Sequence, residues 1–269
     1  MKAPPFGYAK PRSLDEALDL LERPGAKVLA GGQSLIPSLN MRLSSPELLV
    51  DVGAIASLAG VRVNADFVRI GALTTHAQIE RSEEIRKRVP LLAEAAAHIA
   101  HPAIRNRGTL GGSVALADPA AEYPACALAL DATLVILGRK GERRVKAADF
   151  FKGLFETDLE PGEILVAAEF PAGGESVFLE LARRQGDYAS VGIAAHRRSA
   201  EIRLAFFAVG PTAILATHAA AAAKKSVAAA KEALAQDLDP PADLYHSGAT
   251  KLHLARVLLG RALAQWNMS

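Results

Sequence analysis

The pattern of apolar and polar positions predicts alternating helices and strands near the N-terminus. Ser13 and Glu16 have the spacing of a capping box, which indicates a helix over residues 14–22. An extended segment precedes this helix and a short apolar run follows it, so we expect a small βαβ unit and an α/β first lobe. Strands of this lobe are predicted at residues 28–30 and 48–52.

The middle of the chain contains both the apolar spacing of helices and that of strands. Thr75 with Gln78 three positions later predicts a capped helix, and Pro90 begins a helix with one apolar face. Strands and helices therefore follow one another without a strict βαβ order. The other elements expected here are strands at residues 67–71, 132–137 and 163–170 and a helix at residues 125–130.

The C-terminal part reads as strands followed by helices. Residues 171–175, rich in proline and glycine, form the best candidate linker. Short turns join the strands beyond it, which predicts an antiparallel meander. We therefore expect an α+β protein with one domain at 1–172 (lobes about 1–55 and 56–172) and a second at 173–269. Strands are predicted at 177–182, 190–197 and 202–209, and helices at 213–235 and 249–266.

Two loops contain adjacent glycines flanked by small polar residues, Gly31-Gly32 and Gly111-Gly112. Glycine lets backbone N–H groups approach an anion closely, so a diphosphate held between two loops is one interpretation. An ordinary pair of turns is the other. No Gly-Lys-Ser/Thr follows the first pair, which excludes a P-loop, and no G-x-G-x-x-G opens a helix.

These loops also carry a family resemblance. Residues 30–43 (AGGQSLIPSLNMRL) and 105–125 (RNRGTLGGSVALADPAAEYPA) resemble the two flavin-binding signatures of the FAD-binding medium subunits of molybdenum hydroxylases. That family includes carbon monoxide dehydrogenase-like and xanthine dehydrogenase-like enzymes. Further matching segments extend the resemblance over nearly the whole chain. They are residues 46–51, 70–75, 183–189 and 255–262.

The resemblance implies a two-lobed FAD-binding domain of the p-cresol methylhydroxylase/vanillyl-alcohol oxidase (PCMH) type, followed by a small domain of antiparallel sheet and helices. It implies that the first loop holds the pyrophosphate, that the second forms the opposite wall, and that Tyr188 lies near the isoalloxazine. The family usually has Asn at Ser113 and Asp at Glu122, which changes the reach of both side chains. The implied FAD-binding residues are Leu29, Ala30, Gly31, Gly32, Gln33, Ser34, Leu35, Ile36, Ile99, Thr109, Gly111, Gly112, Ser113, Glu122, Leu165, Asp187 and Tyr188.

The resemblance also implies a function shared among chains. FAD would take electrons from iron–sulfur clusters of a small subunit and pass them to NAD, a quinone or another external acceptor. A large subunit would carry molybdopterin, and a dimer of heterotrimers is the usual assembly. No catalytic side chain is required here. The steric argument further predicts that Gly111→Val blocks FAD binding and leaves the fold largely intact.

Composition restricts the alternatives. The net charge of +2 and the few aromatic residues argue against a nucleic-acid partner, and Cys126 alone cannot bind an iron–sulfur cluster. The histidine pairs 98/101 and 246/253 lack further ligands, so no metal site is expected. No uncharged apolar run is long enough for a membrane span, and we expect a cytoplasmic protein. A self-sufficient FAD-dependent oxidase or reductase and a scaffold without flavin stay as rival interpretations.

Overall fold

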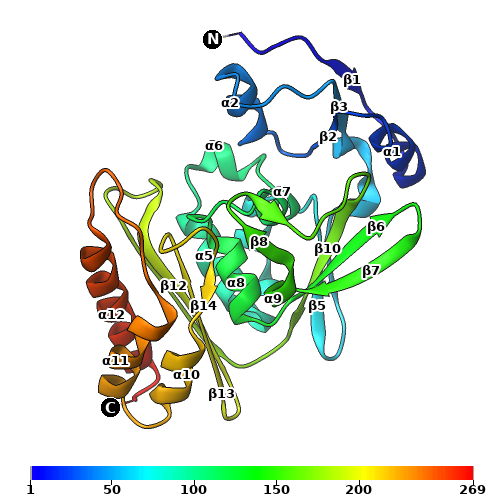
Figure 1. Cartoon of the computed structure of the whole chain (residues 1–269). Coiled ribbons are helices and arrows are strands. Elements are labelled where there is room, and N and C mark those ends of the chain that lie inside the picture. Colours follow the sequence, from blue (N-terminus) through cyan, green and yellow to red (C-terminus); the bar gives the residue numbers. More distant parts are fainter. Residues whose placement is uncertain (1, 269) are drawn as a thin grey trace.

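The computed structural model describes residues 2–268, which form three main sheets and one short hairpin (Figure 1). The first lobe has three parallel strands in the order β1-β3-β2. The hydroxyl of Ser13 accepts the N–H of Glu16 at the start of α1, but the Glu16 carboxylate accepts the N–H of Arg12, so the predicted capping box is only half formed. The lobe consists of β1 (Gly7–Ala9), α1 (Leu14–Leu21), β2 (Ala26–Leu29), α2 (Leu35–Asn40), β3 (Leu48–Asp51) and the 3-10 helices η1 (Val52–Ala54) and η2 (Ala56–Leu58).

The second lobe is an antiparallel five-stranded sheet in the order β4-β5-β10-β6-β7, with helices on one face. The predicted capping box of Thr75 and Gln78 is complete and begins α3. The sequence pattern missed β4 and β7, which are short or largely exposed. The elements are β4 (Val61–Val63), β5 (Phe67–Gly71), α3 (His76–Arg81), α4 (Glu83–Arg88), α5 (Pro90–His98), α6 (Pro102–Arg105), α7 (Leu110–Leu116), α8 (Glu122–Ala129), β6 (Thr133–Gly138), β7 (Gly141–Lys146), α9 (Ala147–Phe150), β8 (Phe151–Gly153), β9 (Glu156–Thr157) and β10 (Ile164–Pro171).

The C-terminal domain is the antiparallel meander expected from the sequence, in the order β11-β12-β13-β14. The helix predicted over 213–235 is wrong as a single element. It is two helices, because the chain turns at Lys224–Lys225 and Ser226 caps a new helix by accepting the N–H of Ala229. The elements are β11 (Glu175–Ala182), β12 (Ala189–Arg198), β13 (Glu201–Phe207), β14 (Ile214–Leu215), α10 (Thr217–Ala223), α11 (Val227–Asp237) and α12 (Gly248–Gln265).

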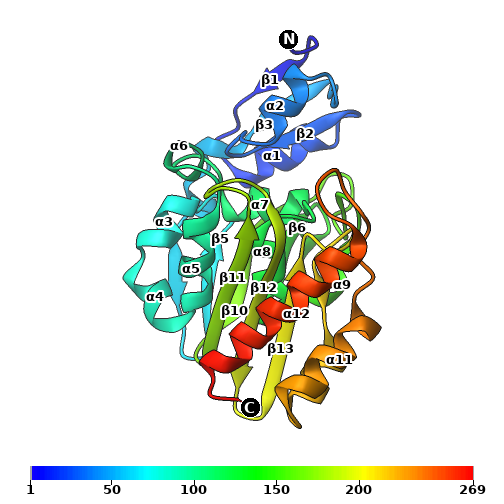
Figure 2. The ribbon, with the colours of Figure 1, turned by 90° about the vertical axis from the view of Figure 1, so that its left-hand side faces the viewer.

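The layers are stacked so that α5 and α8 lie between the second sheet and the C-terminal sheet (Figure 1). One core joins these helices to both sheets and includes Phe178 and Phe207 of the C-terminal domain. A second core lies on the outer face of the C-terminal sheet, under α10, α11 and α12 (Figure 2). A third core joins α1 of the first lobe to β6 and β10 of the second. Each boundary between parts of the chain is therefore closed by buried apolar side chains.

No helix within residues 2–268 combines the length and the apolar character that crossing a membrane requires. In the same part of the chain, no three His, Cys, Asp or Glu side chains are grouped so that they could hold a metal ion. His98 lies beside Glu180, and His246 lies beside Asp243.

Candidate functional site

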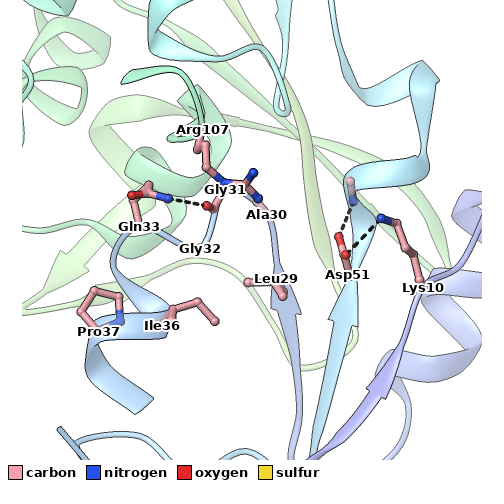
Figure 3. A pocket seen from close by; sticks show the side chains of 11 residues that line it. Lys10, Leu29, Ala30, Gly31, Gly32, Gln33, Ile36, Pro37, Asp51 and Arg107 are labelled. Carbon is pink, nitrogen blue, oxygen red and sulfur yellow. Dashed lines mark hydrogen bonds and ion pairs between the residues drawn. The ribbon is translucent and has the colours of Figure 1, made fainter. Parts of the chain in front are cut away.

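A cavity of about 600 Å³ lies where the first lobe meets the second, at the carboxyl ends of β2 and β3 (Figure 3). Parallel strands end at one edge of their sheet, so the loops after them gather at one place. The first glycine loop forms one wall and Arg107 of the second lobe forms another. The lining residues are Lys10, Leu29, Ala30, Gly31, Gly32, Gln33, Ile36, Pro37, Asp51, Gly53 and Arg107.

The two glycine loops meet at Gly31. A Cβ atom on this residue would overlap the carbonyl oxygen of Arg107 and lie 2.9 Å from the Cα atom of Gly108. Only glycine allows the loops to approach this closely. Gly32 has a φ of +73°, in the left-handed region that favours glycine. Gly31 therefore permits the close contact between the loops, and Gly32 permits the turn.

The first loop presents unused backbone donors. Within residues 2–268, no hydrogen bond is formed by the N–H groups of Gly31, Gly32, Gln33 or Ser34. The Gln33 side chain donates from Nε2 to the carbonyl oxygen of Gly31 at 3.0 Å and so stabilises the turn (Figure 3). Successive free N–H groups around a turn form a concave site for an anion.

The second loop, in contrast, uses its backbone donors inside the protein. The N–H groups of Leu110 and Gly111 donate to carbonyl oxygens of residues 74 and 72, and those of Gly112 and Ser113 donate to Thr109. Thr109 is 5% exposed, and its hydroxyl accepts the N–H of Gly112, whereas Ser113 is half-buried. This loop provides a rigid wall rather than free amide donors.

The expectation that Gly111→Val leaves the fold largely intact is wrong. Gly111 is buried, and a Cβ atom there would lie 2.5 Å from the Cβ atom and 2.8 Å from the carbonyl oxygen of Ala72. Gly112 is exposed, and a Cβ atom there would meet only the Thr109 hydroxyl, at 3.0 Å. The second glycine of the pair, not the first, faces outward.

Two cationic side chains line the cavity. Lys10 lies 3.5 Å from Asp51, whereas the guanidinium group of Arg107 forms no ion pair within residues 2–268 (Figure 3). Burial alone would raise the pKa of Asp51, but hydrogen bonds from Tyr8 and from the N–H of Gly53, with the Lys10 charge, lower it. Asp51 is therefore ionised at neutral pH and fixes Lys10 at the rim.

Sequence reasoning did not assign Lys10, Asp51 or Arg107 to the site. Arg107 and Asp51 lie inside segments that carried the family resemblance, and this location could have identified them as site residues. Lys10 had no such signal, because it lies far from both loops in the sequence. Ser34 and Leu35 belong to the first loop but do not line the cavity.

Ile99 lies at the end of α5, where the second lobe meets the C-terminal domain. Ile99 is 8% exposed, and its carbonyl oxygen and that of Ala100 accept hydrogen bonds from Nη1 of Arg105, at 3.1 and 3.2 Å. Nε of Arg105 donates to Glu80 at 2.9 Å. Ala100 has a φ of +42°, so this ion pair holds a strained turn in place.

The turn between β11 and β12 packs against this strained turn. A Cβ atom on Gly186 would lie 2.7 Å from the carbonyl oxygen of Ala100. Beyond it, the Asp187 carboxylate pairs with Arg183 at 3.1 Å, and Tyr188 is 73% exposed. The structure therefore places the segment that carries Asp187 and Tyr188 against the turn that follows Ile99, at a place separate from the cavity at the first loop.

Glu122 and Leu165 are the two other predicted residues. Leu165 is 6% exposed in β10 and belongs to the same core as Ile99. Glu122 begins α8, and burial raises its pKa to about 8, with further contributions from the charges of Glu180 and Asp118. Partial burial of the Tyr188 side chain, followed by the charges of Asp118 and Glu122, raises the pKa of its phenol.

Comparisons with known proteins agree over the full length. The family model described as the FAD binding domain in molybdopterin dehydrogenase matches residues 4–173, and the model described as the CO dehydrogenase flavoprotein C-terminal domain matches residues 176–266. The 6-hydroxypseudooxynicotine dehydrogenase complex subunit alpha of Paenarthrobacter nicotinovorans is 39% identical, over 98% of this chain and 95% of that protein.

A carbon monoxide dehydrogenase medium chain of Hydrogenophaga pseudoflava is 38% identical, over 99% of both chains. A solved structure of carbon monoxide dehydrogenase from Hydrogenophaga pseudoflava superimposes with a TM-score of 0.94 at 38% identity, over 98% of both chains. Sequence and fold therefore point to the same group of proteins.

Proposed function

The chain belongs to the FAD-binding medium subunits of molybdenum hydroxylases, and from this membership we propose that it binds FAD and transfers electrons within a multi-subunit enzyme. The cavity at the first glycine loop carries this proposal. It combines the free backbone N–H groups of Gly31, Gly32 and Gln33 with Lys10 and Arg107, which suits the two negative charges of a pyrophosphate. The close contact of Gly31 with Arg107 brings the two lobes together there.

The residues present fit the cofactor. The N–H groups of Gly31 to Ser34 would bind the pyrophosphate, with Gly112 and Ser113 on the opposite wall. Ile99, Leu165 and Tyr188 would surround the isoalloxazine, and Asp187 and Glu122 would border it. We propose that all seventeen residues predicted from the sequence, from Leu29 to Tyr188, form the FAD site. Three observations support this assignment: the cavity, the contact between the two glycine loops, and the packing of Gly186 against Ala100.

Bound FAD supplies the group that accepts and donates electrons. The side chains of this chain bind and orient the cofactor, exclude water from one side and set the local charge. No side chain is required as a general acid or base. The Arg105–Glu80 pair holds the wall formed by residues 99 and 100, and the hydrogen bond from Gln33 holds the first loop.

The assembly follows from the family. The chain is the medium subunit beside a small iron–sulfur subunit and a large molybdopterin subunit. We further propose a dimer of these heterotrimers and an external acceptor such as NAD or a quinone. The domain boundary at 172/173 is supported by the ranges of the two family models, 4–173 and 176–266. The cytoplasmic location expected from the sequence stays a prediction.

The decisive experiment is the visible absorption spectrum of the purified chain, followed by heat release and chromatography of the bound cofactor. We expect a flavin spectrum and about one FAD per chain, in line with a single site. A matched sample of the Arg107→Gln variant should show a lower occupancy at the same protein concentration. A colourless chain that takes up no added FAD, alone or with its partner subunits, would contradict the proposal.

A further inference from the structure

The imidazole ring of His76 lies against the segment that leads into the second glycine loop. His76 is the first residue of α3, and the complete cap formed by Thr75 and Gln78 fixes the start of this helix. The N–H of His76 donates to the carbonyl oxygen of Gly108 at 3.0 Å, and Thr75 pairs with Thr109 as an isolated antiparallel bridge. The backbone of this segment therefore holds His76, which is 5% exposed, beside Gly108.

The His76 ring occupies the space that a side chain at position 108 would need. A Cβ atom on Gly108 would lie 2.6 Å from Nε2 and 2.7 Å from Cδ2 of His76, closer than real Cβ atoms approach other groups. The N–H of Gly108 donates to the carbonyl oxygen of Ile104 in α6 at 2.7 Å. The ring and these backbone hydrogen bonds together fix the position of Gly108.

Gly108 also contacts the first lobe. A Cβ atom on Gly31 would lie 2.9 Å from the Cα atom of Gly108 and would overlap the carbonyl oxygen of Arg107. Gly31 and Arg107 both line the cavity, and Figure 3 shows them next to each other at its wall. A continuous series of contacts therefore connects the His76 ring, through Gly108, to the loop that presents the free N–H groups.

The His76 ring also packs against the core of the second lobe. Its centroid lies 5.3 Å from that of the Tyr123 ring, and Tyr123 of α8 is completely buried in the core that joins both sheets. Nδ1 of His76 and the hydroxyl of Tyr123 form no hydrogen bond within residues 2–268. Burial, with a smaller contribution from Arg105, lowers the pKa of His76 to about 4, so the ring is neutral at neutral pH. The ring therefore supports Gly108 by packing rather than by charge.

We propose that His76 is a positioning residue for the cavity at the first glycine loop, because its ring keeps Gly108 at the distance at which Gly31 packs against it. The inference rests on the proposed FAD function, since the contact sets the spacing of the two lobes around the pyrophosphate. His76 does not line the cavity and acts only through Gly108. Protein interiors are close-packed, so without the ring Gly108 and the carbonyl group of Arg107 move toward the vacated space. The contact with Gly31 then loosens.

The first test uses the full chain without cofactor. The amide resonances of Gly31 and Gly32 in a heteronuclear NMR spectrum report on the contact between the lobes. We expect His76→Ala to shift both resonances, and we expect His76→Phe, which retains an aromatic ring, to shift them less. Unchanged resonances of both glycines in His76→Ala would overturn the proposal.

Two further variants keep this test decisive. Ile85→Ala opens a cavity in the same core, on α4, and is the matched control that should leave the Gly31 and Gly32 resonances in place. If His76→Ala does not fold, His76→Leu replaces it, because leucine fills part of the space but lacks the ring atoms that reach Gly108. Equal shifts in Ile85→Ala and the His76 variant would also overturn the proposal.

The second test measures FAD affinity by titration of the folded full-length variants. We expect binding to be roughly fivefold to tenfold weaker in His76→Ala, closer to wild type in His76→Phe and unchanged in Ile85→Ala. His76 and Gly31 act on the same contact, so adding His76→Ala to Gly31→Ala should weaken binding much less than His76→Ala does in the wild type. Additive effects of these two substitutions would overturn the proposal. A chain that takes up no FAD, alone or with its partner subunits, would instead overturn the proposed function, while the amide resonances would still show whether His76 sets the contact between the lobes.

Discussion

The main chain of Gly31 lies directly against the carbonyl oxygen of Arg107, so that a Cβ atom on Gly31 would overlap this oxygen. Gly31 follows a strand of the first lobe, and Arg107 precedes the second glycine loop of the second lobe. One glycine therefore sets how closely the two lobes approach at the proposed pyrophosphate site.

Gly31→Ala tests this contact. The methyl group has no flexible neighbour to displace, because the atoms it meets belong to the backbone of Arg107 and Gly108. We expect the loops to separate and FAD to bind at least about tenfold more weakly, equivalent to about 1.4 kcal/mol, as measured by titration calorimetry. Gly138→Ala is the control, since its nearest neighbour is the Glu163 side chain at 3.2 Å. Equal affinity in Gly31→Ala and the wild type would refute the role of the contact.

Arg107 and Lys10 are expected to differ in their contributions. Arg107 has no ion-pair partner within residues 2–268, whereas Lys10 already pairs with Asp51. A hydrogen bond to a charged group contributes about 1.5 to 3 kcal/mol, so Arg107→Gln should weaken FAD binding roughly tenfold or more and reduce its salt dependence. Lys10→Gln should have a smaller effect. Lys27→Gln, an exposed lysine of the same lobe, should have none, and the reverse order of effects would contradict the site.

Arg105 is predicted to stabilise the turn at residues 99 and 100. Arg105→Ala leaves two carbonyl oxygens and the Glu80 carboxylate without their donor, so urea unfolding should show a loss of about 2 kcal/mol. A double-mutant cycle with Glu80→Gln should give a coupling energy of about 0.5 kcal/mol or more. Arg81→Ala, at the exposed end of α3, should change stability little. Additive effects of the two substitutions would show that the pair does not act as a unit.

His76 is predicted to make the fold sensitive to acid. It lies under the second glycine loop at 5% exposure, and burial, with a smaller contribution from Arg105, lowers its pKa from 6.5 to about 4. As pH falls, His76 takes up its proton at a higher pH in the unfolded chain than in the folded protein. The contribution of neutral His76 to the free energy of unfolding is therefore fully present above about pH 6.5 and is lost between about pH 6.5 and pH 4.

The size of this effect is about 3 kcal/mol, because one pKa unit corresponds to about 1.4 kcal/mol. Urea unfolding at a series of pH values should show this loss in the wild type. His76→Phe, which cannot be protonated, should show a correspondingly smaller loss. If both proteins lost the same stability over this range, another group would be responsible.

The adjacent glycines of the second loop should respond in opposite ways. Gly111→Val places atoms against the backbone of Ala72, so we expect a lower melting temperature and poor folding. Gly112 is exposed, and Gly112→Val should keep the melting temperature but lower FAD affinity through the proposed second wall. Thermal unfolding and FAD titration of both variants separate the two roles. Normal FAD affinity in Gly112→Val would show that this wall does not touch the cofactor.

Much of the fold could be predicted because its signals are local. The cap at Thr75, the apolar face after Pro90 and the short turns of the C-terminal meander each depend on residues a few positions apart. The prediction of a single helix over 213–235 was wrong because it also depended on a local pattern. The alanine pattern continues through it, and only the cap at Ser226 marks the break.

The family, most of the order of the elements and the positions of the two glycine loops are predictable from the sequence alone. The packing of the lobes controls which backbone groups of those loops are available. The first loop has free N–H groups, and the second uses its own to hold Thr74, Ala72 and Thr109. The packing of the domains also brings Lys10 to the cavity and buries the Glu180 carboxyl group beside His98. Caps and periodicity act over one or two turns of the chain, whereas these contacts depend on how separate sheets and helices pack against each other.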